Sequence, residues 1–236
     1  MSNLRLFHLD NITENTTSLL SKEHTHYVVN VMRLKRGSNL NFFNKSGEWL
    51  SEIVFLDRDR VEVKILDKIK EPTITSNIEL AICLVKKTPM ETILQKATEL
   101  GVSKIVPIIS DRTEIKELNF ERANKIVIEA TEQSNQMSPP EISKVIKLKN
   151  YIEALESKIL FFADVNSSNK LELKNFKLGI TNCILIGPEG DFSPSEREHI
   201  LKKSSVIPFS LSKNILRTDT AVISAISLVN FINNNH

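Results

Sequence analysis

From residue 78 onward, short apolar runs alternate with segments that carry helix-start signals. The runs have the length of buried strands, and Ser193-Pro194-Ser195-Glu196 is a capping box, with serine as the N-cap and proline as the first helical residue. Thr88-Pro89-Met90-Glu91 repeats this signal. Strands that alternate with helices pair in parallel and are covered on both faces, so we expect an α/β fold. The expected strands are 78–85, 105–109, 158–162, 183–186 and 206–209, and the expected helices are 88–100, 119–134 and 218–232.

The N-terminal part of the chain has a different pattern, with short strand-like runs joined by tight turns. This pattern predicts a small β-barrel. The polar segment 71–77 contains a proline, and the period changes after it, so it is the best domain boundary. We therefore predict two domains, residues 1–72 and 73–236. In the first, we expect a helix over 22–32 and strands over 4–7, 40–43, 49–56 and 61–69.

The charges nearly cancel, with 31 lysines and arginines against 29 aspartates and glutamates and a formal net charge of +2. Any basic surface for nucleic acid must therefore be local. Cys83 and Cys183 lie inside apolar runs, which is typical of reduced core residues in a cytoplasmic protein. The chain has no signal-peptide pattern and no apolar run of about 18 residues. We expect a cytoplasmic protein without a membrane partner.

The six glycines are too scattered to form a dinucleotide-binding fingerprint, and the Gly-Lys-Ser/Thr of a P-loop does not occur. Nucleotide hydrolysis and ordinary dinucleotide chemistry are therefore not expected. His24 and His26 are two positions apart, which places them on different faces of a helix. Because no cluster of cysteines or carboxylates completes a ligand set, we expect no metal.

Two segments near the C-terminus have the form of ligand-binding corners. Gly187–Glu196 follows the run 183–186, and Leu211–Arg217 stands between the run 206–209 and the apolar helix 218–232. Loops that follow nearby parallel strands meet at one edge of the sheet, so these two would bound one pocket. The alternative is a plain strand-to-helix turn, because glycine turns before capped helices are common.

Two charged residues in these corners are not accounted for by a core. Glu189 lies in a glycine-flanked turn and should face solvent or a ligand. Arg217 immediately precedes the apolar helix, where the helix dipole disfavours a cation, so its guanidinium needs an anionic or acceptor-rich partner. That partner is a ligand or, alternatively, Asp219 or Glu189 in an ion pair.

A local basic surface is predicted in the N-terminal domain, where cations cluster and aromatic residues offer stacking faces for bases. The alternative is an ordinary solvated surface. The cations are Arg33, Lys35, Arg36, Arg58 and Arg60, and the aromatic residues are Tyr27 and Phe43.

Together, the motifs resemble a known family, the SPOUT-superfamily methyltransferases that modify N3 of a uridine in 16S ribosomal RNA. The resemblance covers almost the whole chain, and its last two motifs are the most specific. In chain order the motifs are His26 with 31–35 and Gly37, then 95–102 with Pro107 and Arg112, then 129–134, then Ile186-Gly187-Pro188-Glu189-Gly190, and then Leu216-Arg217-Thr218-Asp219-Thr220-Ala221.

The resemblance implies a C-terminal SPOUT domain with a parallel sheet and a trefoil knot, and an N-terminal PUA-like barrel that binds RNA. It also implies S-adenosylmethionine as cofactor, 16S ribosomal RNA as partner and a homodimer. In the implied mechanism Arg217 stabilises negative charge on the uracil oxygens, and Glu189 orients Arg217 or accepts the proton. The implied cofactor-binding residues are Gly187, Pro188, Gly190, Leu211, Ser212, Ile215 and Leu216, and the implied RNA-binding residues are Arg5, Arg33, Lys35, Arg36 and Arg112.

The chain departs from the family pattern at several positions. Asp191 and Asn135 stand where the family has glycine, Gln136 stands where it has arginine, and Ser212-Lys213-Asn214 replaces Gly-Pro-Arg. Lost glycines affect how closely the backbone approaches a cofactor, and lost arginines affect the grip on RNA. Two alternatives therefore stay open: a SPOUT ribose 2′-O-methyltransferase, and a non-catalytic RNA-binding or ribosome assembly factor that keeps the fold.

Overall fold

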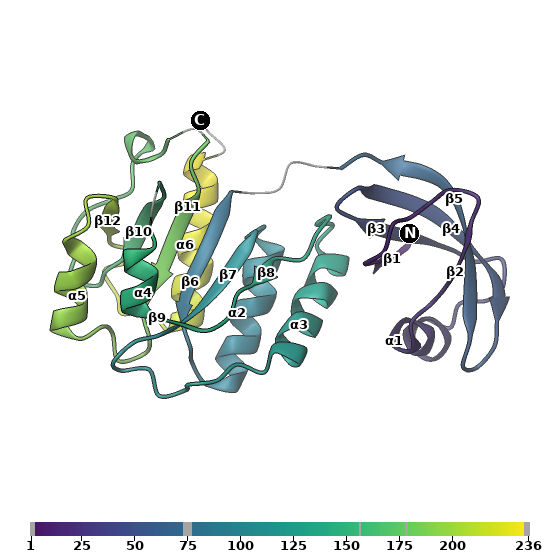
Figure 1. The fold of residues 1–236 in the computed structure, drawn as a ribbon, viewed down its shortest axis with the longest axis horizontal. Helices are drawn as coiled ribbons and strands as arrows, with labels where there is room; N and C mark the ends of the chain where they lie inside the picture. Colours follow the sequence, from purple (N-terminus) through teal and green to yellow (C-terminus); the bar gives the residue numbers. More distant parts are fainter. Residues whose placement is uncertain (1–2, 73–76, 156, 178, 234–236) are drawn as a thin grey trace. The chain divides into compact units, whose positions relative to one another are not determined.

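The computed structural model of the protein describes residues 3–72, 77–155, 157–177 and 179–233 (Figure 1). The chain divides into two compact units, residues 1–75 with 131–138 and residues 76–130 with 139–236. The predicted boundary between residues 72 and 73 adjoins residues 73–76, which lie outside the described residues. It therefore stays a prediction. Residues 131–138 belong to the first unit although they are distant from it in sequence.

The first unit contains a mixed five-stranded sheet in the order β1-β3-β4-β5-β2. β1 pairs in parallel with β3, and the other neighbours are antiparallel. The predicted helix over 22–32 is α1 followed by a π-helix, Tyr27–Val31. β2 was not predicted, because it has three residues and none is buried. The elements are β1 (Leu4–Phe7), β2 (Thr17–Leu19), α1 (Lys22–His26), β3 (Asn39–Asn44), β4 (Gly47–Leu56) and β5 (Val61–Lys70).

Apolar side chains at alternating positions of the strands form the core of the first unit. Leu40, Phe42, Ile53 and Val63 are at most 1% exposed and pack into one apolar cluster. The hairpin between β3 and β4 depends on Gly47, which has φ +146° and would place a Cβ 2.7 Å from the carbonyl oxygen of Lys70. Only glycine fits such a conformation at such a close approach.

A buried polar cluster centres on Arg5. Its Nε donates to Glu48 Oε2 at 3.1 Å, and its guanidinium carbon lies 4.0 Å from the centroid of the Phe43 ring. The two remaining nitrogens donate to the carbonyl oxygens of Glu132 at 3.2 Å and Gln136 at 3.0 Å. Arg5 therefore fastens the segment 131–138 to the sheet of its own unit.

The second unit is built on a parallel sheet, as the sequence predicts. The strand order is β12-β10-β11-β6-β7-β8, with β9 also paired to β7, and every pairing is parallel. The strands are β6 (Ile78–Cys83), β7 (Lys104–Ile109), β8 (Glu141–Ile142), β9 (Ile146–Lys147), β10 (Ile159–Ala163), β11 (Asn182–Ile186) and β12 (Val206–Phe209).

Helices cover both faces of this sheet (Figure 1). Leu80 and Ile82 of β6 point to the cluster formed with α2, α3 and α6, whereas Ala81 and Cys83 point to the cluster formed with α4 and α5. The side chains on both faces of β6 are therefore buried, which explains why every residue of this strand except Glu79 is apolar. The helices are α2 (Lys87–Glu99), α3 (Phe120–Gln133), α4 (Leu148–Glu153), α5 (Pro194–Leu201) and α6 (Thr218–Asn233), with a short 3₁₀ turn at Leu173–Asn175.

One predicted capping box is confirmed and the other is wrong. Ser193 is the N-cap of α5, where its Oγ accepts from Glu196 N at 3.3 Å and its own N–H donates to Glu196 Oε2 at 2.9 Å. The predicted box at Thr88 is not formed, because α2 begins at Lys87 and its N-cap residue, Lys86, makes no side-chain bond. Pro89 still lies in the first turn, where backbone N–H groups have no intrahelical acceptor. The N–H group that proline lacks therefore removes no hydrogen bond from the helix.

Buried groups on the α4 face hold that helix to the sheet. The carboxylate of Glu79 is 3% exposed and accepts from the Tyr151 hydroxyl at 2.8 Å and from Lys158 Nζ at 2.9 Å. Cys83 and Cys183 are fully buried, as predicted, and burial raises the pKa of each thiol to about 12. Within the described residues, no helix has the length and apolar character needed to cross a membrane.

Replacing Arg5 with methionine should lower the free energy of unfolding of the first unit by about 3–5 kcal/mol, because it leaves the Glu48 carboxylate buried without its cation. Trp49 is the only tryptophan in the chain and is buried in this unit, so its fluorescence during a urea titration reports on this unit. Arg58→Met, at an exposed position of the same unit, is the matched control. Equal stability of the two variants would contradict the anchoring role of Arg5.

Candidate active site

Three loops leave the sheet of the second unit at the same edge. β10 lies between β11 and β12 and is parallel to both, so the segments that follow these three strands emerge together. Two of them are the predicted corners, Gly187–Glu196 and Leu211–Arg217. The third, residues 164–169 after β10, was not predicted, and it lies between the other two in strand order.

The third loop is held by Asp164, which is 2% exposed. Its carboxylate forms a bidentate ion pair with Arg197 of α5, with Nη2 to Oδ2 at 2.8 Å and Nε to Oδ1 at 3.2 Å. The bond to Asp164 raises the pKa of Arg197 above its ordinary value. At the other end of the loop, Ser210 N donates to the carbonyl oxygen of Asn169 at 2.9 Å. A polar run after a wholly apolar strand was the signal in the sequence that could have identified this loop.

The loop after β11 is a tight turn. A Cβ on Gly187 would lie 3.0 Å from the ring of Phe192, so any other residue there would require the ring to shift. Asp191 N donates to the Pro188 carbonyl at 2.9 Å, and Asp191 itself has φ +58°. Its Oδ1 accepts from Phe192 N at 2.8 Å. An aspartate with this local bond tolerates the left-handed conformation that the family's glycine would adopt.

A second position where the family has glycine also holds a residue that tolerates the left-handed conformation. Asn135, in the segment 131–138, has φ +59°. Asparagine and aspartate are the residues other than glycine that visit this region most readily. Both exchanges therefore preserve the backbone turn.

The loop after β7 is fastened to the loop after β11. Asp111 N donates to Glu196 Oε1 at 2.8 Å, and Ser193 Oγ donates to Asp111 Oδ2 at 2.7 Å. Arg112 Nη1 donates to the Gly190 carbonyl at 2.7 Å. Arg112 was predicted to bind RNA, but in this structure its guanidinium holds the loop Gly187–Gly190.

The loop after β12 exposes its backbone and most of its side chains. Ile215 is 91% exposed, and Ser212 Oγ accepts from Asn214 N at 3.0 Å. The backbone N–H groups of Ile215 and Leu216 donate to no acceptor in the described part of the chain. These groups, which belong to the predicted cofactor set, are available to a ligand.

The two predicted catalytic residues are exposed and unpaired. Arg217 precedes α6 and its carbonyl oxygen accepts from Ala221 N at 2.8 Å, so its backbone lies at the helix N-terminus. Among the described residues, neither the Arg217 guanidinium nor the Glu189 carboxylate has a hydrogen bond or ion pair. The alternative in which Arg217 pairs with Asp219 or Glu189 is therefore not realised.

The predicted RNA-binding residues of the first unit separate into two groups. Arg33, Lys35 and Arg36 are exposed in the turn after the π-helix, where Arg33 has φ +52° and Leu34 N donates to the Val28 carbonyl at 3.0 Å. Arg5 is 8% exposed and its guanidinium is occupied by Glu48 and backbone carbonyls. We therefore remove Arg5 from the RNA-binding set, since no face of its guanidinium is left for a phosphate.

Comparison with known proteins identifies the class. The family described as RNA methyltransferase domain matches residues 70–230, and the family described as RNA methyltransferase PUA domain matches residues 20–66. The parallel α/β sheet and the N-terminal mixed sheet are therefore those of an RNA methyltransferase with a PUA-like domain. Within the described residues, no group of three or more His, Cys, Asp and Glu side chains could hold a metal ion.

Individual relatives show to which family of RNA methyltransferases the chain belongs. The chain is 32% identical over 233 residues to the ribosomal RNA small subunit methyltransferase E of Rickettsia conorii, covering 97% of this chain and 95% of the relative. It is similar in structure to the protein of that name from Neisseria gonorrhoeae bound to S-adenosyl methionine, with a TM-score of 0.86, 26% identity and 98% of both chains covered. The chain belongs to the ribosomal RNA small subunit methyltransferase E family.

Asp191→Ala should lower the free energy of unfolding of the second unit by about 1–2 kcal/mol, because alanine is strained in the left-handed region and lacks the side-chain bond to Phe192 N. Asp191→Gly should keep or raise the stability, since glycine adopts this conformation without strain. Urea titration followed by far-ultraviolet circular dichroism measures both. A glycine variant as unstable as the alanine variant would show that the side chain, and not the backbone conformation, is what the turn requires.

Proposed function

We propose that this protein transfers the methyl group of S-adenosylmethionine to N3 of one uridine in 16S ribosomal RNA. Membership of the ribosomal RNA small subunit methyltransferase E family supports the substrate class. The observation that carries the chemistry is the exposed side chain of Arg217, which is unpaired among the described residues and directly follows the unsatisfied backbone N–H groups of Ile215 and Leu216.

The loops after β11 and β12 fit the cofactor. Adenine presents donors and acceptors on its edge, and free backbone groups at Ile215 and Leu216 match such an edge. Gly190 supports the fit, because a Cβ there would meet nothing closer than Arg112 carbons at 3.7 Å, which leaves an open face on the loop. We assign cofactor binding to Gly187, Pro188, Gly190, Leu211, Ser212, Ile215 and Leu216. The bound cofactor supplies an electrophilic methyl group on a sulfonium.

The residues of this chain align the two reactants and stabilise the negative charge that develops on the uracil ring. N3 of uracil attacks a methyl group only as its proton leaves, and negative charge then spreads to the two carbonyl oxygens of the ring. Arg217 stabilises that charge, because a preorganised cation costs no reorganisation when the charge develops. Alignment of the two reactants contributes much of the remaining acceleration. Glu189 is unpaired in the described structure, so it is free to accept the proton or to turn toward Arg217 when substrate binds.

RNA binding is assigned to the basic turn of the first unit, Arg33, Lys35 and Arg36, through contacts to phosphates. A homodimer is also proposed. It is supported by apolar side chains that α6 exposes, with Ile223 at 37% and Phe231 at 70% exposed. The trefoil knot of the SPOUT domain is proposed from the resemblance of the two C-terminal motifs.

Incubation of the purified protein with 16S ribosomal RNA from cells that lack it should add one methyl group per RNA, which mass spectrometry of nuclease digests should locate on N3 of a uridine. A methyl group on a ribose 2′-oxygen would replace this proposal with the ribose-methylating alternative. Cofactor binding by calorimetry without any transfer would leave a non-catalytic RNA-binding factor.

Arg217→Ala should lower kcat about 10²–10³-fold, the usual effect of removing one donor that stabilises developing negative charge. The affinity for S-adenosylmethionine, measured by calorimetry, should stay the same, because the cofactor is bound by backbone groups. Lys213→Ala removes an exposed cation from the same loop and is the matched control.

The two roles of Glu189 are separated by Glu189→Gln in the same assay. Loss of the acidic limb of the pH–rate profile would identify it as the proton acceptor. An unchanged profile with lower kcat would leave it as the residue that orients Arg217. Undiminished turnover of Arg217→Ala would remove Arg217 from the mechanism.

A further inference from the structure

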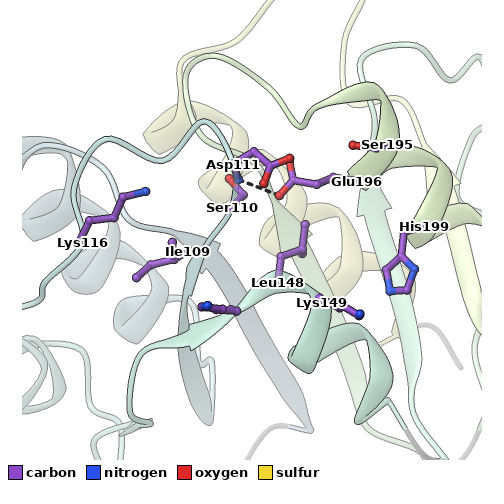
Figure 2. Close-up of a pocket in the computed structure, with 10 residues that line it drawn as sticks. Ile109, Ser110, Asp111, Lys116, Leu148, Lys149, Ser195, Glu196 and His199 are labelled. Carbon is purple, nitrogen blue, oxygen red and sulfur yellow. Dashed lines mark hydrogen bonds between the residues drawn. The ribbon is translucent and has the colours of Figure 1, made fainter.

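A second pocket lies beside the cofactor loops, on the α4 and α5 side of the second unit. Its volume is about 460 Å³, and none of the residues so far assigned to cofactor, catalysis or RNA lines it (Figure 2). Its walls come from three segments: Ile109, Ser110, Asp111 and Lys116 after β7; Lys147, Leu148 and Lys149 at the start of α4; and Ser195, Glu196 and His199 in α5.

The charged groups around this pocket favour an anion. The two carboxylates, of Asp111 and Glu196, are already engaged by Ser193 Oγ at 2.7 Å and by the backbone N–H groups of Asp111 and Ser193 at 2.8 and 2.9 Å. These neutral donors leave both negative charges in place, but three lysines against two carboxylates still give the lining a formal net charge of +1, with His199 left out of the count. Lys116 donates to the carbonyl of Thr113, and Lys149 has only Glu153 at 4.0 Å, with both side chains exposed. The side chain of Lys147 has no ion pair or hydrogen bond within the described residues.

The rest of the wall is apolar and carries one flat ring. Ile109 and Leu148 line the pocket, and Leu148 is 3% exposed. The imidazole of His199 also lines it, and its Nε2 is shielded from solvent without a hydrogen-bond partner among the described residues. A site with lysines, an apolar wall and an imidazole suits a nucleotide, whose base stacks while its phosphate takes the cations.

The pocket is joined to the candidate active site by covalent and hydrogen bonds. Asp111 forms part of its wall, and the next residue, Arg112, holds the Gly190 carbonyl at 2.7 Å. Glu196 lines the pocket and also caps α5 directly after the loop of Gly187. An occupant would therefore contact the elements that fix the cofactor loop.

We propose that this pocket receives a nucleotide of the RNA substrate that flanks the target uridine, with its phosphate on Lys147, Lys149 and Lys116 and its base against Leu148 and His199. The proposal rests on the proposed RNA-methylating function. It makes these residues positioning residues: they set where the RNA strand lies and do not touch the reacting atoms.

The kinetic test uses Lys147→Ala combined with Lys149→Ala. This variant should raise KM for 16S ribosomal RNA about tenfold or more and leave the cofactor affinity and kcat unchanged, because charged hydrogen bonds to phosphate are lost and the chemistry is not. The slope of log affinity against log salt should fall by about one for each lysine removed. The control is Lys144→Ala combined with Lys170→Ala, which removes two exposed lysines that do not line the pocket. It measures the effect of losing two positive charges elsewhere on the protein surface. Equal KM values for the two double variants would overturn the proposal.

The binding test does not depend on catalysis. Uridine 5′-monophosphate, uridine and inorganic phosphate are titrated separately into the full-length protein while the imidazole proton resonances, assigned to His199 with His199→Gln, are followed by NMR. Uridine 5′-monophosphate should shift the His199 resonances at a lower concentration than either of the other two, and the lysine double variant should abolish the shift. Shifts by phosphate alone at the same concentration would reduce the pocket to an anion site, and no shift with any probe would overturn it. If the nucleotide binds but no RNA is methylated, the proposed function fails and the pocket stands.

Discussion

The candidate site depends on one feature of strand pairing, the position of β10 between β11 and β12. Because all three strands are parallel, their carboxyl ends meet at one edge, and three loops distant in sequence are forced together there. The ion pair between Asp164 and Arg197 then ties the middle loop to α5, and the capping box of Ser193 fixes where α5 begins. The exposed backbone of the outer loops can stay open to a ligand because these buried and half-buried bonds hold the loop ends.

Backbone conformation explains why the chain tolerates residues that depart from its family's pattern. A glycine in a turn is required either for a positive φ or for a close approach. At Asp191 and Asn135 only the positive φ applies, and both residue types accept it. At Gly187 the requirement is space, because the Phe192 ring lies where a Cβ would go, and there the glycine is kept. The lost glycines are therefore weak grounds for expecting lost activity.

Much of the fold could be predicted from the sequence, because buried parallel strands and capped helices have strong local patterns. What could not be predicted depended on contacts between distant residues. Arg5 and Arg217 are both single arginines next to apolar residues. The position of Arg217 before an apolar helix marks it in the sequence, but nothing local shows that Arg5 is buried. One is buried against Glu48 because β1 pairs with β3, and the other is left exposed because it precedes α6. The polar run 164–169 can be recognised as a loop from the sequence, but the ion pair of Asp164 cannot, because its partner is 33 positions away.

The bonds between the loops also bear on how substrate and cofactor are coordinated. Arg112 and Asp111 are consecutive, yet one holds the loop Gly187–Gly190 and the other forms part of the wall of the pocket beside α4 and α5. A ligand in that pocket cannot displace residues 110–112 without disturbing the Gly190 carbonyl bond, and the reverse is also true. When both ligands order one shared segment, the affinities of the two sites depend on each other, and the effect is reciprocal for binding. If both sites are occupied as proposed, RNA and cofactor should each bind more tightly when the other is present, because the first ligand has already ordered the shared segment.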